Sequence, residues 1–372
     1  MSYSLATLWY ERQRFLPGVL AVAFSALLIA LQCGLLLGLF SITSMPVDHT
    51  WADVWVGSPE VLSVDLGSAI SESYFTRVAS QPSVHYCESY LQGFAYWSKP
   101  NGGRELCMVI GARLEQDSLG LIQELKERPD LVALLTEPGA ILVDESEVER
   151  LDVKAIGDRA KISEQPVRVV GMLKGLKSLA GPYIFCSTTT ARMVLHLTSE
   201  QTTYFLARCD NPREVVERLN GAYKEDMLAF TRDDFSFRTR MHWLTKTKAG
   251  IALGFAAALG LLVGAIVTSQ TLYAATAASL REYAVLRALG IPRWRMAATV
   301  LAQSFWVGIA GVSIGLPLAF LLSGVAEAVR VPLPLPWWLP TSAAAITLTT
   351  ALLAGLFALR SLRLVEPAVL LR

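Results

Sequence analysis

The chain has 372 residues, of which 53% are hydrophobic and 17% charged, and its formal net charge at pH 7 is +1. This small net charge gives no bulk field for binding nucleic acid. The apolar content excludes an ordinary soluble protein, because four stretches without a charged side chain are long enough to cross a bilayer core of about 30 Å. They lie within residues 16–40, 249–279, 296–326 and 331–359.

The N-terminal part of the chain predicts a surface helix followed by a membrane anchor. Residues 1–15 form an amphipathic pattern with Leu5, Leu8 and Trp9 on one face, which is typical of an interfacial helix. The first transmembrane helix is predicted over residues 16–41. Its apolar run is longer than the roughly 7–15 residues of a signal peptide and no A-x-A site follows, so we expect it to be retained.

Residues 42–247 predict a mixed α/β domain, which we expect to have two lobes. Short apolar runs typical of strands, such as 106–111, 140–143 and 167–173, alternate with helical patterns. The helix expected at 212–223 begins with Asn211 followed by Pro212, a capping residue before proline at the first helical position.

This domain shows no pattern of catalytic or metal-binding residues. His49, His85 and His196 are scattered and lack the H-x-x-x-H or H-E-x-x-H spacing of a metal site, and no G-x-S-x-G motif occurs. We therefore expect a chain that is not an enzyme and that binds no cofactor or metal of its own.

Five cysteines are present, and four of them fall in the predicted outer domain, where oxidation is possible. Four cysteines allow three pairings. Cys186 and Cys209 each end an apolar run, and Cys87 and Cys107 could close a hairpin, so these are the candidate disulfides. Free buried thiols are an equally good alternative, because a domain of this size needs no covalent staples.

The C-terminal part predicts three further transmembrane helices, at residues 249–278, 296–323 and 338–360. A short loop at 324–337 and a tail at 361–372 complete this region. The absence of charge within the spans argues against an ion-coupled carrier. Glycines four residues apart predict close helix packing, and secondarily contact with a second copy. These glycines are Gly250 and Gly254, Gly260 and Gly264, and Gly311 and Gly315.

Arginines predict the orientation in the membrane, since positive residues collect on the cytoplasmic side. Arg12 and Arg14 precede the first span, four arginines lie between the second and third, and three follow the fourth. The loop between the third and fourth spans offers only Arg330. Both termini and residues 279–295 are therefore predicted to be cytoplasmic, with residues 42–247 outside.

Residues 279–295 predict a short cytoplasmic helix that is apolar on one side and cationic on the other. Gly290 supplies the helix stop and Pro292 begins the next helix. Such a helix also fits an anionic lipid surface.

The segment from Arg281 to Gly290, R-E-x-A-V-L-R-A-L-G, resembles the sequence that follows the second span in FtsX-like permeases. This family includes MacB, LolC and LolE, and DevC. The C-terminal residues 362–372 resemble its closing tail, and residues 137–144, 156–158 and 167–171 resemble its outer-domain segments in the same order. The chain therefore resembles a MacB-type (type VII) ABC transporter permease without a fused ATPase domain. Residues 60–135 show nothing diagnostic of the family.

The resemblance implies a permease subunit in the bacterial inner membrane. It would couple ATP hydrolysis by a separate ATPase subunit to a conformational change of the outer domain, for export or extraction of a lipid, peptide or other amphiphile. No G-x-x-x-x-G-K-[ST] motif occurs, so ATP and Mg²⁺ are expected on the partner. The residues expected to contact the ATPase are Arg281, Glu282, Leu286, Arg287, Leu289 and Gly290.

The implied partners are an ATPase dimer and a second permease copy, in a homodimer or a related heterodimer. A membrane-fusion adaptor or another periplasmic protein is compatible with the resemblance. The alternative function is that of an FtsX-like transmitter that regulates an outer enzyme such as a cell-wall hydrolase.

Overall fold

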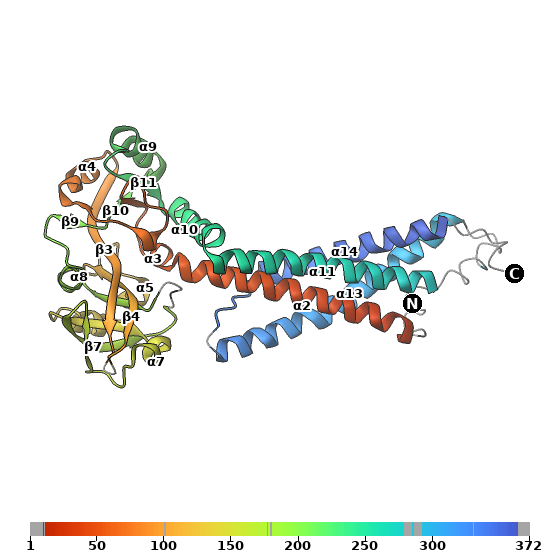
Figure 1. The fold of residues 1–372 in the computed structure, drawn as a ribbon. Coiled ribbons are helices and arrows are strands. Elements are labelled where there is room, and N and C mark those ends of the chain that lie inside the picture. Colours follow the sequence, from red (N-terminus) through yellow and green to blue (C-terminus); the bar gives the residue numbers. More distant parts are fainter. Residues whose placement is uncertain are drawn as a thin grey trace. The chain divides into compact units, whose positions relative to one another are not determined.

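The computed structural model describes residues 10, 12–99, 102–176, 178, 181–278, 285, 292–329 and 331–363. The chain has two compact units (Figure 1). Residues 39–250 form an α/β unit, and residues 1–38 together with 251–372 form a helical unit. Most of the predicted surface helix at 1–15 and most of the predicted cytoplasmic helix at 279–295 lie outside the described residues.

Four long helices make up the helical unit. They are α2 (Arg12–Thr43), α11 (Lys248–Ala278), α13 (Arg293–Ala328) and α14 (Trp338–Arg363). Each contains a stretch long and apolar enough to cross a membrane: Phe15–Thr43, Lys248–Thr271, Ala297–Ala328 and Trp338–Leu356. The four predicted spanning helices are therefore confirmed, together with the large mixed α/β unit inserted after the first of them.

Small residues allow these helices to approach one another. Val22 of α2 packs with Val307 of α13 and Ala351 of α14, and further along α2, Ile29 packs with Ala319 and Ala343. Because lipid tails are as apolar as these side chains, close van der Waals packing is what holds such helices together.

The connection between α13 and α14 packs on α2. A Cβ atom added to Gly34 would lie 3.2 Å from Leu335, and one added to Gly38 would overlap the carbonyl oxygen of Pro332. The two glycines of α2 thus form a shallow groove that holds the proline-rich segment 332–335.

The α/β unit is built around a nine-stranded sheet in the order β11-β1-β10-β3-β4-β8-β5-β7-β6. The strands are β1 (Val54–Gly57), β3 (Val84–Ser98), β4 (Arg104–Ala112), β5 (Ala140–Asp144), β6 (Arg159–Ile162), β7 (Gln165–Leu173), β8 (Tyr183–Ser187), β10 (Tyr204–Cys209) and β11 (Leu228–Thr231). A separate pair joins β2 (Ile70–Ser71) to β9 (Gln201–Thr202).

Six of these strands close on themselves, because β3 pairs with β6 as well as with β4. The interior of this closed sheet is apolar, with Trp97, Val109, Ile141 and Ile184 fully buried. The helices α7 (Val148–Leu151) and α8 (Thr188–Leu195) contribute side chains to the same core.

Two further cores lie on opposite faces of β1 and β10, because Trp55 belongs to one and its neighbours Val54 and Val56 belong to the other. One gathers residues from α3 (Met45–Asp48), α5 (Gln123–Lys126), α6 (Pro129–Leu134) and α10 (Arg232–Lys246). The other packs α4 (Phe75–Ala79) and α9 (Pro212–Tyr223) against β1 and β10. Pro212 begins α9 and Asn211 precedes it, as predicted. Three short 3₁₀ helices complete the unit: η1 (Val64–Leu66), η2 (Glu72–Tyr74) and η3 (Glu145–Glu147).

Candidate functional site at the base of the α/β unit

The six residues predicted to contact an ATPase lie outside the described residues. They are Arg281, Glu282, Leu286, Arg287, Leu289 and Gly290. Within the same motif, Val285 is described; it is helical and 46% exposed. The described part of the molecule that connects the α/β unit to the long helices is the base of that unit, where the chain passes to and from α2 and α11.

Two short helices make these connections. Helix α3 follows α2 after Ser44, and α10 is separated from α11 by Thr247 alone. Thr231 caps α10, because its Oγ1 accepts a hydrogen bond from the backbone N–H of Asp234 at 3.2 Å. Asp233 and Asp234 in the first turn add charges that favour the positive end of the helix.

A polar cluster joins α3 to α10, and we call Ser44, Asp48, Ser236 and Arg240 the junction cluster. Arg240 donates from Nη2 to Asp48 Oδ2 at 2.6 Å and from Nε to Ser44 Oγ at 2.9 Å. Ser44 and Ser236 also donate to the Asp48 carboxylate, at 2.6 and 2.7 Å. Arg232, one residue after the cap, donates to the carbonyl oxygen of Asp48. Helix α3 is thus bound to α10 over two turns of α10, from Arg232 to Arg240.

Aromatic packing anchors the beginning of α10 to the sheet. Phe235 is fully buried and stacks on Phe230 of β11 with ring centroids 5.0 Å apart. It also contacts Trp55 of β1 and Tyr204 of β10, at 5.6 and 5.7 Å. Aromatic pairs of this kind stabilise a contact by about 0.5–1.5 kcal/mol beyond the area they bury.

The remainder of α10 is held by the segment that contains η1. Thr239 Oγ1 accepts from the N–H of Val64 at 3.1 Å, and Arg238 Nε donates to the carbonyl oxygen of Val61 at 3.1 Å. One turn later, Trp243 Nε1 donates to Asp65 Oδ2 at 3.0 Å. The connection to α11 is therefore bound to the α/β unit along most of its length.

His49, directly after α3, extends the base towards α5. Its Nδ1 lies 2.6 Å from Glu124 Oε1, and its carbonyl oxygen accepts from the N–H of Gln123. The hydrogen bond to Glu124 raises the pKa of His49, and burial opposes this effect only in part. The pair therefore favours the protonated imidazole.

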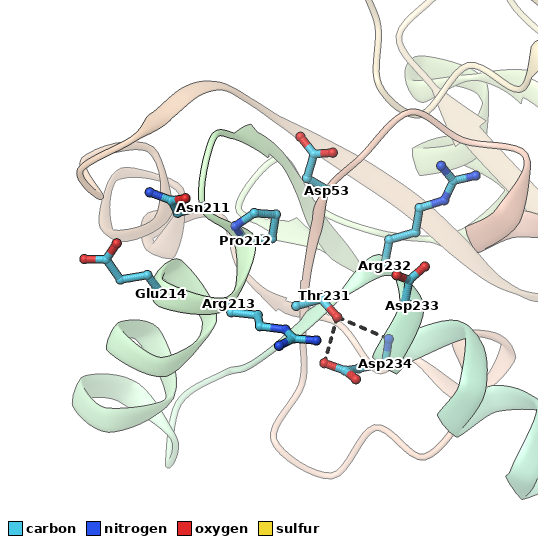
Figure 2. A pocket seen from close by; sticks show the side chains of 9 residues that line it. All are labelled: Asp53, Asn211, Pro212, Arg213, Glu214, Thr231, Arg232, Asp233 and Asp234. Carbon is cyan, nitrogen blue, oxygen red and sulfur yellow. Dashed lines mark hydrogen bonds between the residues drawn. The ribbon is translucent and has the colours of Figure 1, made fainter.

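An open cleft of about 730 Å³ lies beside this base (Figure 2). It is lined by the beginnings of α9 and α10 and by Asp53. Asp53 accepts from the N–H of Cys209, and Asp234 accepts from the hydroxyl of Thr231. Both carboxylates are therefore already hydrogen-bonded to neighbouring groups of the protein. Figure 2 shows their carboxylates pointing in different directions. No group of three metal-ligating side chains occurs among the described residues.

The glycines predicted to pack helices lie mostly at helix contacts. A Cβ atom on Gly260 would lie 3.2 Å from Gln32 of α2, and one on Gly264 would overlap Ser25. On α13, a Cβ atom on Gly311 would lie 2.6 Å from Val22, and Gly315 faces Ala23 and Ala26 of α2. Gly250 lies against the backbone of Trp243 and Leu244, and Gly254 is partly buried in α11. The pair Gly34 and Gly38 has the same spacing and lies against segment 332–335.

Neither predicted disulfide is present, and all five cysteines are free thiols. Strands β3 and β4 separate the strands of Cys186 and Cys209, a distance of about 14 Å. Cys107 faces Ala95, which is eight residues, or about 25 Å, along β3 from Cys87. A disulfide requires Cα atoms within about 7 Å. The structure therefore supports neither pairing and contains the alternative, free thiols.

Sequence reasoning missed the junction cluster because Asp48 and Arg240 are 192 residues apart in the chain. A local signal does exist, since Ser44 and Asp48 stand four residues apart and this spacing brings two side chains to one helical face. It does not reveal the partner.

Comparisons with known proteins identify the region after the α/β unit. Residues 254–367 match the family model of the FtsX-like permease C-terminal domain. An ABC transporter permease of Methanocaldococcus jannaschii is 28% identical over 181 residues, which is 46% of this chain and 45% of that protein. The macrolide export ATP-binding/permease protein MacB of Hyphomonas neptunium is 28% identical over 262 residues, 67% of this chain and 39% of that protein. The chain thus spans less than half the length of each relative.

Among solved structures, the periplasmic region of MacB from Actinobacillus actinomycetemcomitans aligns with 50% of this chain and 92% of its own. The sequence identity is 11% and the TM-score is 0.33, values too low to support any conclusion. The resemblance predicted from residues 281–290 and the C-terminal tail is confirmed by the family match: residues 254–367 are similar to the FtsX-like permease C-terminal domain, and the chain is similar to an ABC transporter permease and to a MacB protein.

Proposed function

We propose that this chain is the permease subunit of an ABC transporter of the FtsX/MacB type and that it works with a separate ATPase subunit. The observation that carries the proposal is the family match over residues 254–367, which includes most of α11 and all of α13. The sequence contains no P-loop motif, so ATP and Mg²⁺ would be bound by the partner. Residues 281–290 would contact that partner through their apolar and charged faces.

The proposed orientation has both termini and residues 279–295 in the cytoplasm of a bacterial inner membrane. Residues 42–247 would then lie outside. The distribution of arginines supports this orientation.

The proposed mechanism is mechanical. Motion of α2 and α11, driven by the ATPase, would reach the α/β unit through α3 and α10, and the junction cluster would make these two connections move together. Residue pairs such as Asp48 and Arg240, joined by charge-assisted hydrogen bonds, keep their geometry better than neutral contacts do. The cargo would be a lipid, peptide or other amphiphile handled outside, by a pair of permease copies.

Affinity purification of the chain from its native membrane tests this proposal. We expect a P-loop ATPase to co-purify and the preparation to hydrolyse ATP. Replacing Leu286 and Arg287 by glutamate should abolish both while leaving membrane insertion intact. The matched control is Arg128→Glu, which changes an exposed charge in the α/β unit. Unchanged co-purification of the ATPase with the double variant would overturn the coupling assignment.

Thiol labelling of intact cells tests the orientation separately. A Lys161→Cys variant places a thiol at an exposed position of β6, and it should react with an impermeant maleimide. A Gly290→Cys variant should resist the reagent until the membrane is permeabilised. The opposite pattern of labelling would overturn the orientation.

A further inference from the structure

A buried carboxyl group lies where α10 packs against the rest of the α/β unit. Asp65, on η1, is only 4% exposed. Its Oδ2 accepts from Trp243 Nε1 at 3.0 Å, and its Oδ1 lies 3.4 Å from Gln92 Nε2, a long contact. Among the described residues, no lysine, arginine or histidine forms an ion pair with Asp65. A carboxylate in this position would have only neutral donors to replace water.

In the part of the chain that the structure describes, the titratable groups that interact with Asp65 are tyrosines. Tyr90 of β3, Tyr183 of β8 and Tyr204 of β10 are fully buried around it. Burial raises the pKa of each tyrosine, so each remains neutral at any physiological pH. They therefore supply no charge that could compensate an ionised Asp65.

Three charged groups on the adjoining elements are bound elsewhere. On α10, Arg238 donates to the carbonyl oxygen of Val61, and Arg240 binds Asp48. On β3, Glu88 accepts from the N–H of Gly120 at 2.6 Å. The environment of Asp65 thus has low polarity and contains no fixed counter-charge.

The neutral acid fits this environment better than the carboxylate does. Gln92 Oε1 is buried and has no hydrogen-bond partner in the described part of the chain. Rotating the Gln92 amide by 180° brings this oxygen next to Asp65 Oδ1, where a protonated carboxyl can donate to it. Trp243 continues to donate to Oδ2. Protonation therefore replaces the long contact from Gln92 Nε2 by a hydrogen bond to the Gln92 oxygen, and it removes a buried charge.

We propose that Asp65 is a proton-dependent joint between α10 and the α/β unit. The neutral acid holds Trp243 and the end of α10 in place, and loss of the proton loosens them. The joint lies one turn before the junction with α11, so its state affects the segment that connects the α/β unit to a spanning helix. This proposal concerns a property of the α/β unit and does not require any transport activity.

The burial of Asp65 places the transition near neutral pH. Burial raises the pKa of Asp65 from 3.8 to about 7, and the hydrogen bond from Trp243 lowers it only in part. Because the pKa is higher in the packed state than in an open, solvated state, the stabilisation is fully present below about pH 4 and decreases as the pH rises through 7. For these two pKa values, the equilibrium constant for opening increases about ten-fold between pH 6 and pH 8.

Hydrogen exchange of the purified full-length chain in nanodiscs tests this proposal. Exchange of the amides of α10, after correction for the intrinsic rate, should be about ten-fold faster at pH 8 than at pH 6. Asp65→Asn keeps the shape but cannot ionise, and it should remove this difference. Asp117→Asn, an exposed control, should retain it. Equal pH dependence in the wild type and Asp65→Asn would overturn the proposal.

A second variant keeps the proposal testable if Asp65→Asn does not fold. Trp243→Phe removes the one short hydrogen bond that the carboxylate accepts among the described residues. Since this bond lowers the pKa of Asp65, its loss should move the midpoint of the exchange transition to higher pH. If Trp243→Phe makes α10 exchange faster without moving the midpoint, Trp243 acts by packing alone and the proton-dependent joint is excluded.

Discussion

Replacing Arg240 by methionine should weaken the attachment of α10 to α3 by a measurable amount. The substitution removes two hydrogen bonds, one of them to the Asp48 carboxylate at 2.6 Å, and keeps most of the apolar stem. Hydrogen bonds to charged groups contribute about 1.5–3 kcal/mol, whereas exposed ion pairs contribute about 0.2–1 kcal/mol. The side chains of Arg240 and Asp48 are 36% and 28% exposed, so we expect a value between these ranges, about 1–2 kcal/mol.

The effect should appear as a lower unfolding temperature of the α/β unit. For a unit of about 200 residues, 1 kcal/mol corresponds to about 2–4 °C, which gives a decrease of about 2–8 °C. The assay is thermal unfolding of the full chain in nanodiscs, monitored by tryptophan fluorescence. Arg128→Met is the matched control, because its ion pair with Asp130 is more than half exposed and should contribute less than about 1 kcal/mol.

A double-mutant cycle with Asp48→Asn separates the pair from its surroundings. If Arg240 acts through Asp48, the two substitutions together should cost less than the sum of their separate effects, with a coupling energy of about 1 kcal/mol. Additive effects, or a decrease for Arg240→Met no larger than that of the control, would refute the idea that the junction cluster holds the two connections together.

Three further outcomes are expected. Gly38→Ala should lower the unfolding temperature of the helical unit, because the added methyl group meets the backbone of segment 332–335; Gly324→Ala, with open space around it, should be neutral or slightly stabilising in the same assay. The His49–Glu124 pair should stabilise the base most where Glu124 is ionised and His49 is protonated, and this effect should be lost as the pH rises through the raised pKa of His49 or falls through the lowered pKa of Glu124; His49→Gln should flatten the dependence of unfolding temperature on pH. The four cysteines of the α/β unit should react slowly with maleimide until the protein is denatured, since burial raises the pKa of each thiol; a mobility change on reduction would reveal a disulfide instead.

The parts of the fold that could be predicted are those in which a local pattern has a single structural meaning. A run of about 20 apolar residues has few alternatives to a spanning helix, and the four runs became α2, α11, α13 and α14. Asn211 followed by Pro212 likewise specified the beginning of α9.

The pairing of strands could not be predicted, because it depends on contacts between distant parts of the chain. The predicted hairpin is present between β3 and β4, but it does not bring Cys87 to Cys107, because β3 is 15 residues long and only residues 91–98 pair with β4. The first part of β3 pairs instead with β10, more than 100 residues later. No local sequence pattern indicates the residue at which β3 stops pairing with β10 and begins pairing with β4.

The candidate site was hidden for the same reason. In the sequence, Asp65 is an ordinary polar residue in a segment that also contains Leu62 and Leu66. Trp243 is an aromatic residue shortly before a predicted spanning helix. Only the packing of α10 over η1 brings them within 3.0 Å and removes water from the carboxyl group. Burial is a property of the folded chain, and it is burial that gives Asp65 its unusual pKa.

The sheet order explains why a change at the base can affect the rest of the α/β unit. The base is attached to β1 and β11. Strand β10 follows β1 in the sheet order, and the closed part of the sheet begins at β3. Strand β3 belongs to both parts: residues 84–90 pair with β10, and residues 91–98 pair with β4 (Figure 1). Because these two ladders follow one another along β3, this strand is the hydrogen-bonded link between the part of the sheet at the base and the closed part. A displacement of α3 and α10 would therefore reach the closed part through β3, whereas loosening α10 at Asp65 would weaken this coupling at its start.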